Sequence, residues 1–187
     1  MKIKLWTIQH IEAYHRLKET GILCANEEYL FCQDDLRFAY DWMVEQMRIK
    51  IGPPPVGVGY PIWAWYQWEG ERKRRDLRFS GYAQRGTPMV QIEFEVEDSS
   101  VLLSDFDGWD FVLNNSYLAD NEEKFDKFYT SETEKNQCEI CASWDKIFDL
   151  ERYTPNWHCP SEKMSIQATL WQVHISQVKK VEFFTAK

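Results

Sequence analysis

Both faces of one short segment are apolar or aromatic, and this feature restricts the possible folds of the chain more than any other. Residues 61–68 read PIWAWYQW, with three tryptophans and a tyrosine in eight positions. In a β-strand successive side chains point to opposite faces, so Ile62 and Ala64 would share one face and Trp63 and Trp65 the other. Such a strand is either central in its sheet and covered on both sides, or it has one face that lines a pocket where flat rings meet a flat ligand.

Aromatic residues make up 16% of the 187 residues, and nine of them are tryptophans. A chain of this length commonly folds as one domain with a sizeable core, so we expect residues 1–187 to form a single domain. The first residues lack the apolar run of a signal peptide, and no segment approaches the roughly 18 apolar residues that a membrane-spanning helix needs. We therefore expect a cytoplasmic protein that makes no membrane contact.

The charge of the chain is unevenly distributed. The formal net charge is −8, which weighs against generic nucleic-acid binding because contacts to phosphates need clustered positive charge. Residues 71–86, the basic segment, reverse this balance with six Lys or Arg residues against two acidic ones. The segment is either a solvated loop or a local site for a phosphate or another anion beside the rings. In the second reading the anion is bound by Arg72, Arg74, Arg75 and Arg78.

Five cysteines are scattered through the chain, an odd number that does not fit the disulfide framework of a secreted protein. Cys138 and Cys141, together with His158 and Cys159, could supply the four nitrogen and sulfur ligands of a structural zinc site. The first pair falls within a predicted helix and the second pair is adjacent, so one ion would be held with strained geometry. We therefore predict inert, reduced thiols and no metal.

Local patterns predict the order of the elements. Alternation predicts strands at residues 3–8 and 90–96, the second with its glutamine and glutamates facing water. Helical spacing predicts a helix over residues 10–20 that ends at Gly21, and a longer one that starts at Asp34-Asp35 and stops at the prolines after Gly52.

Further along the chain, Ser104 with Asp107 has the form of a helix cap, and Ser131 with Glu134 is a second possible cap in a helical region over residues 120–152. Strands are predicted at residues 166–173 and 181–184. Helices and strands do not alternate regularly, so we expect an α+β fold with a mixed, mainly antiparallel sheet of five to six strands and inserted helices.

Two groups of polar residues are candidates for chemistry. Asp105 and Asp107 follow an apolar strand, where two carboxylates could bind Mg²⁺ or a ribose or act as a general base. The structural reading, which we favour, is that they complement the helix dipole. Gln9, Gln67 and Gln167 lie on three predicted strands. If those strands are neighbours, their amides could converge on a base or carboxamide edge while Trp6, Trp63 or Trp65 stacks on the ring. The alternative is that each amide caps a strand edge or faces water.

Several sequence blocks resemble the signature of an uncharacterised bacterial family, a domain of unknown function: LWTIQ, AYDWM, PIWAWYQ, LLSDFD and IQATLW. The order of elements is also similar to that of compact ADP-ribosyltransferase-like domains. That similarity implies NAD as the ligand and places Gln9 and Gln167 where those domains carry a polar residue and a catalytic glutamate. Gln167 has no carboxylate, so it cannot act as a general base.

The sequence therefore favours a protein that binds a nucleotide-like ligand in an aromatic cleft, as a divergent ADP-ribosyltransferase-like domain. Whether it is an enzyme is left open; the catalytic candidates are Gln9, Gln167, Asp105 and Asp107. The residues expected to bind the ligand are Trp6, Trp63, Trp65, Gln67, Arg72, Arg74, Arg75 and Arg78. The alternative is a non-enzymatic interaction or regulatory module, antitoxin-like, whose acidic surface meets a basic protein partner.

Overall fold

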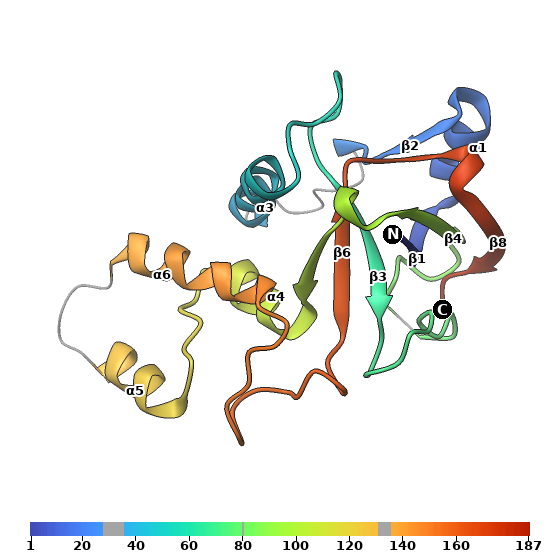
Figure 1. Cartoon of the computed structure of the whole chain (residues 1–187). Coiled ribbons are helices and arrows are strands. Elements are labelled where there is room, and N and C mark those ends of the chain that lie inside the picture. Colours follow the sequence, from blue (N-terminus) through green and yellow to red (C-terminus); the bar gives the residue numbers. More distant parts are fainter. Residues whose placement is uncertain (28–35, 80, 131–135) are drawn as a thin grey trace. The chain divides into compact units, whose positions relative to one another are not determined.

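The computed structural model describes residues 1–27, 36–79, 81–130 and 136–187 (Figure 1). Their contacts divide the chain into two compact units. Unit 1 comprises Met1–Tyr66, Lys73–Leu102 and Ala168–Lys187; unit 2 comprises Gln67–Arg72 and Leu103–Gln167. The single domain stays a prediction. Among the described helices, none is long and apolar enough to cross a membrane.

The strands form a six-stranded and a two-stranded sheet. The larger sheet has the order β5-β6-β3-β1-β4-β8 and contains β1 (Lys2–His10), β3 (Ile62–Gln67), β4 (Pro88–Glu97), β5 (Leu102–Asp105), β6 (Ile166–Leu170) and β8 (Val178–Thr185). β1 runs antiparallel to β3 and to β4, and β4 runs antiparallel to β8. The smaller sheet pairs β2 (Ile22–Cys24) with β7 (Gln172–His174). The predicted α+β class with a mainly antiparallel sheet is confirmed.

The described α-helices are α1 (Ile11–Thr20), α3 (Arg37–Lys50), α4 (Phe106–Leu113), α5 (Glu122–Thr130) and α6 (Gln137–Ser143). Short 3-10 segments lie at Asp98–Ser100, Trp144–Phe148 and Ile175–Gln177. α1 ends as predicted at Gly21, whose φ of 79° is a left-handed conformation that glycine adopts without a Cβ clash. The apolar stripe predicted for α3 is also confirmed, because its buried residues are Ala39, Met43 and Met47.

The core of unit 1 lies on one face of β1 and β4. Leu5, Val90, Ile92 and Phe94 are fully buried there. α1 contacts both strands, and its Tyr14 packs edge-on against Phe183 of β8, with 5.4 Å between ring centroids. Because side chains alternate along a strand, the opposite face of the same strands carries the polar and aromatic residues between these core positions.

The aromatic strand β3 lies inside the sheet, between β6 and β1. Ile62 and Ala64 are buried, whereas Trp63 and Trp65 are only half-buried. Trp63 packs edge-on against Tyr40 of α3, with 5.9 Å between ring centroids. One face of β3 is therefore packed as core, and the tryptophan face keeps some contact with water.

Several predicted boundaries differ from the structure. Residues 166–173 do not form one strand but split into β6 and β7, which belong to different sheets. The cap of α4 is Asp105, which accepts a hydrogen bond from Asp107 N at 3.1 Å, whereas Ser104 lies in β5. The predicted helical region over residues 120–152 contains α5, α6 and a 3-10 segment. The acidic pair at 34–35 and the predicted cap at 131–134 lie outside the described residues.

The water-facing side predicted for β4 is partly wrong. Gln91 is only 3% exposed and Glu93 is half-buried. Alternation correctly places these side chains on the face away from the core, but β1 and β8 flank β4 on both sides and Arg74 of the basic segment reaches Gln91. The alternation of side chains within one strand does not show which other segments of the chain cover that strand.

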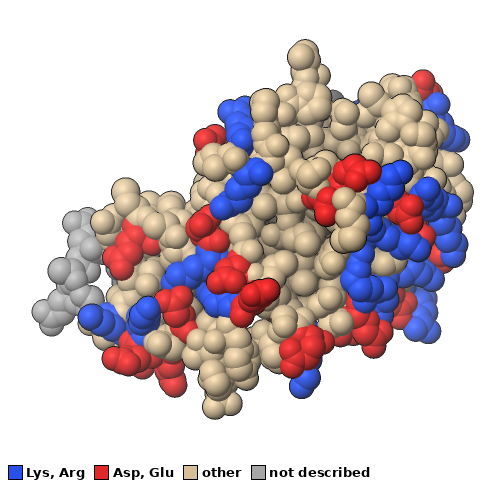
Figure 2. All heavy atoms as spheres, viewed as in Figure 1, with Lys and Arg blue, Asp and Glu red and all other residues tan. Residues whose placement is uncertain are grey.

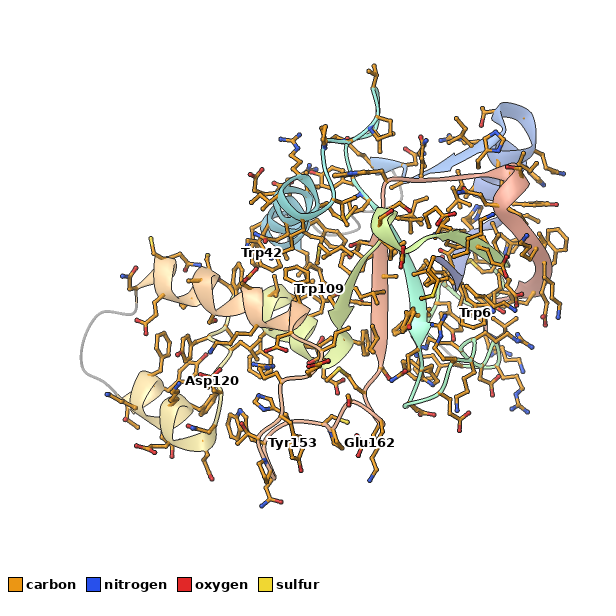
Figure 3. All side chains as sticks on the ribbon, in the orientation of Figure 1. Trp6, Trp42, Trp109, Asp120, Tyr153 and Glu162 are labelled. Carbon is orange, nitrogen blue, oxygen red and sulfur yellow. The ribbon has the colours of Figure 1, made fainter. Side chains whose placement is uncertain are left out.

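Unit 2 packs its helices through aromatic contacts. Tyr117 stacks on Phe128 at 4.2 Å between centroids, and Trp144, only 1% exposed, donates a hydrogen bond to the carbonyl of Ser116. Asp120, labelled in Figure 3, lies 2.6 Å from Lys124 Nζ and 2.7 Å from Lys146 Nζ.

Candidate functional site

A small pocket opens on the face of β1, β4 and β8 that lies away from the core of unit 1. Its volume is about 160 Å³. Strand register brings its walls together, because Trp6 lies opposite Glu93, Glu93 opposite Lys180, and Gln91 opposite Glu182. The lining residues are Trp6, Arg74, Gln91, Glu93, Lys180 and Glu182. Only Arg74 comes from outside the sheet.

The indole and carboxylate in the pocket hold each other in place. Trp6, labelled in Figure 3, is 7% exposed and donates from Nε1 to Glu93 at 2.9 Å. Lys4 Nζ lies 3.0 Å from the other oxygen of Glu93. Burial of Glu93 raises its pKa, but the hydrogen bonds from Lys4 and Trp6 outweigh that effect and the net shift is downward. Glu93 is therefore a fixed carboxylate at neutral pH.

Gln91, one of the residues that line this pocket, has a buried donor without an acceptor among the described residues. Arg74 Nη1 lies 3.2 Å from its Oε1, and because a guanidinium only donates, the amide oxygen must face Arg74. The amide nitrogen Nε2 is then fixed on the other side, where it is buried and meets no acceptor among the described residues. An unpaired buried donor of this kind costs about 1–3 kcal/mol.

The pocket carries charges of both signs. Arg74 Nη1 also lies 3.4 Å from Glu182, and Lys180 Nζ lies 3.9 Å from the same carboxylate. Figure 2 shows lysines and arginines interleaved with acidic side chains over the edge of the sheet that β8 forms. The site therefore offers donors to an anionic group and acceptors to a hydrogen-bond donor, rather than a purely basic surface.

Arg75, the residue after Arg74, lies against aromatic rings and does not line the pocket. Arg75 Cζ lies 4.9 Å from the ring centroid of Trp65, 4.8 Å from that of Phe79 and 5.2 Å from that of Tyr82. Arg78 is held differently, by a bidentate pair with Asp76 in which Nη2 and Oδ2 are 2.6 Å apart. Arg74, Arg75 and Arg78 thus have three different environments within five positions.

The structure brings only some of the residues predicted to bind the ligand together. The structure brings Trp6 and Arg74 together in the pocket, and register pairs Trp6 with Trp65 across β1 and β3. Gln67 donates both amide hydrogens to the carbonyls of Ser161 and Met164. Arg72 is exposed in unit 2.

None of the catalytic candidates is among the residues that line the pocket. Gln9 donates to Thr7 Oγ1 at 2.7 Å, on the core side of β1. Gln167 is 5% exposed in β6, and its Nε2 is buried without an acceptor among the described residues. Asp105 caps α4, and burial raises its pKa; burial also raises the pKa of Asp107, with repulsion from Asp110 adding to the shift. Their catalytic roles stay predictions.

Of the cysteines predicted to be inert, Cys24 lies in β2 and three lie in unit 2, whereas Cys32 lies outside the described residues. Cys138 is exposed and Cys141 half-buried on α6, and Cys159 is exposed after His158. Across the described ranges, no group of three or more His, Cys, Asp or Glu side chains is arranged to hold a metal ion.

Four lining residues were not predicted from the sequence: Gln91, Glu93, Lys180 and Glu182. Gln91 and Glu93 lie in the strand predicted from alternation, where each looks like an ordinary water-facing side chain. Glu182 lies in the predicted strand 181–184, and Lys180 lies just before it, because β8 begins at Val178. The one available signal was a glutamine among the glutamates of β4, because an amide at such a position can be buried at lower cost than a carboxylate.

Comparison with known proteins gives a family but no activity. Residues 4–138 match the model of a family described as Domain of unknown function (DUF3841). A search of the curated proteins finds no match.

Proposed function

Because the chain belongs to this family of unknown function, no activity comes with membership, and we propose from the geometry that it binds a nucleotide-like ligand in the pocket of β1, β4 and β8. The observation that carries the proposal is the buried Nε2 of Gln91, a donor on a pocket-lining residue that meets no acceptor in the described part of the chain. Ring nitrogens and carbonyls of nucleobases are acceptors of the required kind.

The other lining groups suit the rest of such a ligand. Arg74 and Lys180 supply positive charge for a phosphate, and Glu182 can accept from an exocyclic amine. Trp6 supplies the only aromatic surface of the lining, and its indole is held at a fixed angle by Glu93. Base, amine and phosphate therefore each have a complementary group within one pocket.

The volume limits the size of the ligand. Sites for drug-sized molecules commonly measure about 300–1,000 Å³, well above the 160 Å³ found here. We therefore propose that the pocket holds one base or similar ring and that the phosphate lies at its mouth. A dinucleotide such as NAD would be bound through one half only. The proposal is one of binding and includes no catalytic step.

The test is a thermal-shift and calorimetric screen with AMP, GMP, CMP, UMP, nicotinamide mononucleotide and NAD. A ligand present at about 100 times its Kd stabilises by about 2.7 kcal/mol, which corresponds to a rise in Tm of roughly 5–10 °C for a chain of this size. Gln91→Met should weaken binding about tenfold by removing the donor. Gln84→Met, an exposed glutamine of the basic segment, is the matched control and should bind normally.

Two results would contradict the proposal: no ligand of the screen shifts the Tm, or Gln91→Met binds as tightly as the unchanged protein. The first result would favour the alternative of a protein-interaction or regulatory module. A pull-down that recovers a basic protein, with Trp63→Ala unfolded rather than unable to bind ligand, would then select that alternative.

A further inference from the structure

Three aromatic rings surround a single cation at the surface of unit 1. The guanidinium carbon of Arg75 lies 4.8–5.2 Å from the ring centroids of Trp65, Phe79 and Tyr82. Each distance is within the roughly 6 Å at which the negative face of a ring attracts a positive charge. The three rings, named here the aromatic cage, therefore act on one group together.

The rings have supports that do not depend on Arg75. Trp65 belongs to β3 and is aligned with Trp6 by strand pairing. Tyr82 donates its hydroxyl hydrogen to the carbonyl of Asp76 at 2.8 Å and packs edge-on against Phe184 of β8, with centroids 6.0 Å apart. Phe79 in turn packs edge-on against Tyr82, with centroids 5.8 Å apart. The cage can therefore keep its shape when the cation is exchanged.

The cage is also open to water on one side. Phe79 is 54% exposed, so its ring forms an outer wall that a cation from solution can reach. Cation–π contacts at partly exposed sites are weak individually.

We propose that Trp65, Phe79 and Tyr82 form a binding site for an external guanidinium group, and that Arg75 occupies this site in the absence of the ligand. The choice of guanidinium follows from the resident group, since the spacing of the rings already accommodates a planar cation of that size. The guanidinium can come from an arginine side chain of a partner protein or from a free small molecule. This proposal does not depend on the nucleotide pocket.

The test uses Arg75→Ala, which empties the cage. NMR titration follows the indole N–H signal of Trp65 while N-acetyl-arginine amide, an acetylated Gly-Gly-Arg-Gly-Gly peptide, or N-acetyl-lysine amide is added. Binding of the arginine compounds to Arg75→Ala should be at least tenfold tighter than to the unchanged protein, and the lysine compound should bind more weakly than either. A peptide that binds much more tightly than the amide would point to a protein partner; equal affinities would point to a small molecule.

Two further variants make the test decisive. Arg78→Ala removes an arginine of the same loop that is held by Asp76 instead of the rings, and it should bind like the unchanged protein. Adding Phe79→Ala to Arg75→Ala removes the exposed wall without touching the sheet and should abolish the gain. The proposal is overturned if Arg75→Ala binds no more tightly, if the double variant binds equally well, or if the Trp65 signal shows that the rings separate once Arg75 is gone.

Discussion

Replacing Gln91 by methionine should make the protein more stable and less able to bind its ligand. The amide of Gln91 is 3% exposed and its Nε2 meets no acceptor among the described residues, a defect worth about 1–3 kcal/mol. Methionine has a similar volume and no donor, so the defect disappears. The substitution also removes the 3.2 Å hydrogen bond from Arg74, whose side chain is exposed enough to turn to water or to Glu182, a loss of about 0.5–1 kcal/mol.

The net expectation for Gln91→Met is a gain of about 0.5–2 kcal/mol in the free energy of unfolding, since relief of the buried donor outweighs the lost hydrogen bond. For a chain of this size that corresponds to a rise in Tm of roughly 1–8 °C. Urea unfolding followed by circular dichroism measures the change, with Gln84→Met as the exposed control. A residue that lowers stability and is retained for binding is the pattern expected of a functional site.

A loss of stability of more than about 1 kcal/mol in Gln91→Met would refute this reasoning. It would mean that Nε2 is already satisfied in solution, for instance by ordered water, and that the amide is part of the scaffold. The nucleotide proposal would then lose its main support, whereas the aromatic cage would be unaffected.

Three other expectations concern stability alone. Burial raises the pKa of Asp120, but hydrogen bonds from Lys124 and Lys146 outweigh that effect and lower the pKa to about 2. The contribution of this carboxylate to the free energy of unfolding should therefore be full above about pH 4 and lost as the pH falls toward 2. Asp120→Asn should remove this pH dependence from a series of urea-unfolding measurements. Gly70→Ala should lower the Tm clearly more than Gly57→Ala, because both glycines have positive φ but only at Gly70 would the new Cβ clash with the backbone of Glu162. Trp144→Ala should cost about 3–5 kcal/mol in urea unfolding, and a loss below about 1 kcal/mol would show that its site is not core.

Local patterns predicted the elements well where the signal lies within one segment. The helix that ends at Gly21 and the apolar stripe of α3 follow from helical spacing and from the conformational freedom of glycine. The doubly apolar character of residues 61–68 indicated a strand and left open whether its second face is covered or lines a pocket; the structure places this strand, β3, between β6 and β1. The expected membership of a family of unknown function is confirmed by the match over residues 4–138, whereas the individual sequence blocks stay a prediction.

The environment of a side chain was predicted less well, because it depends on distant segments. Gln91 has the same alternating position as the glutamates near it, and only the approach of Arg74 and the pairing with β8 bury it. The cap of α4 was misplaced by one residue, because Ser104 and Asp105 are both acceptable capping residues and the end of β5 decides between them.

The sequence by itself determined the types of element, the α+β class and the concentration of rings and arginines in residues 61–86, since these depend on spacing within one segment. Only the tertiary structure decided which side chains share a site. Strand order and register bring Trp6, Gln91 and Glu182 together from three separate strands, and the loop places Arg74 over one part of the sheet and Arg75 over another. The physical reason is that periodicity fixes the face on which a side chain lies, whereas long-range pairing fixes its neighbours.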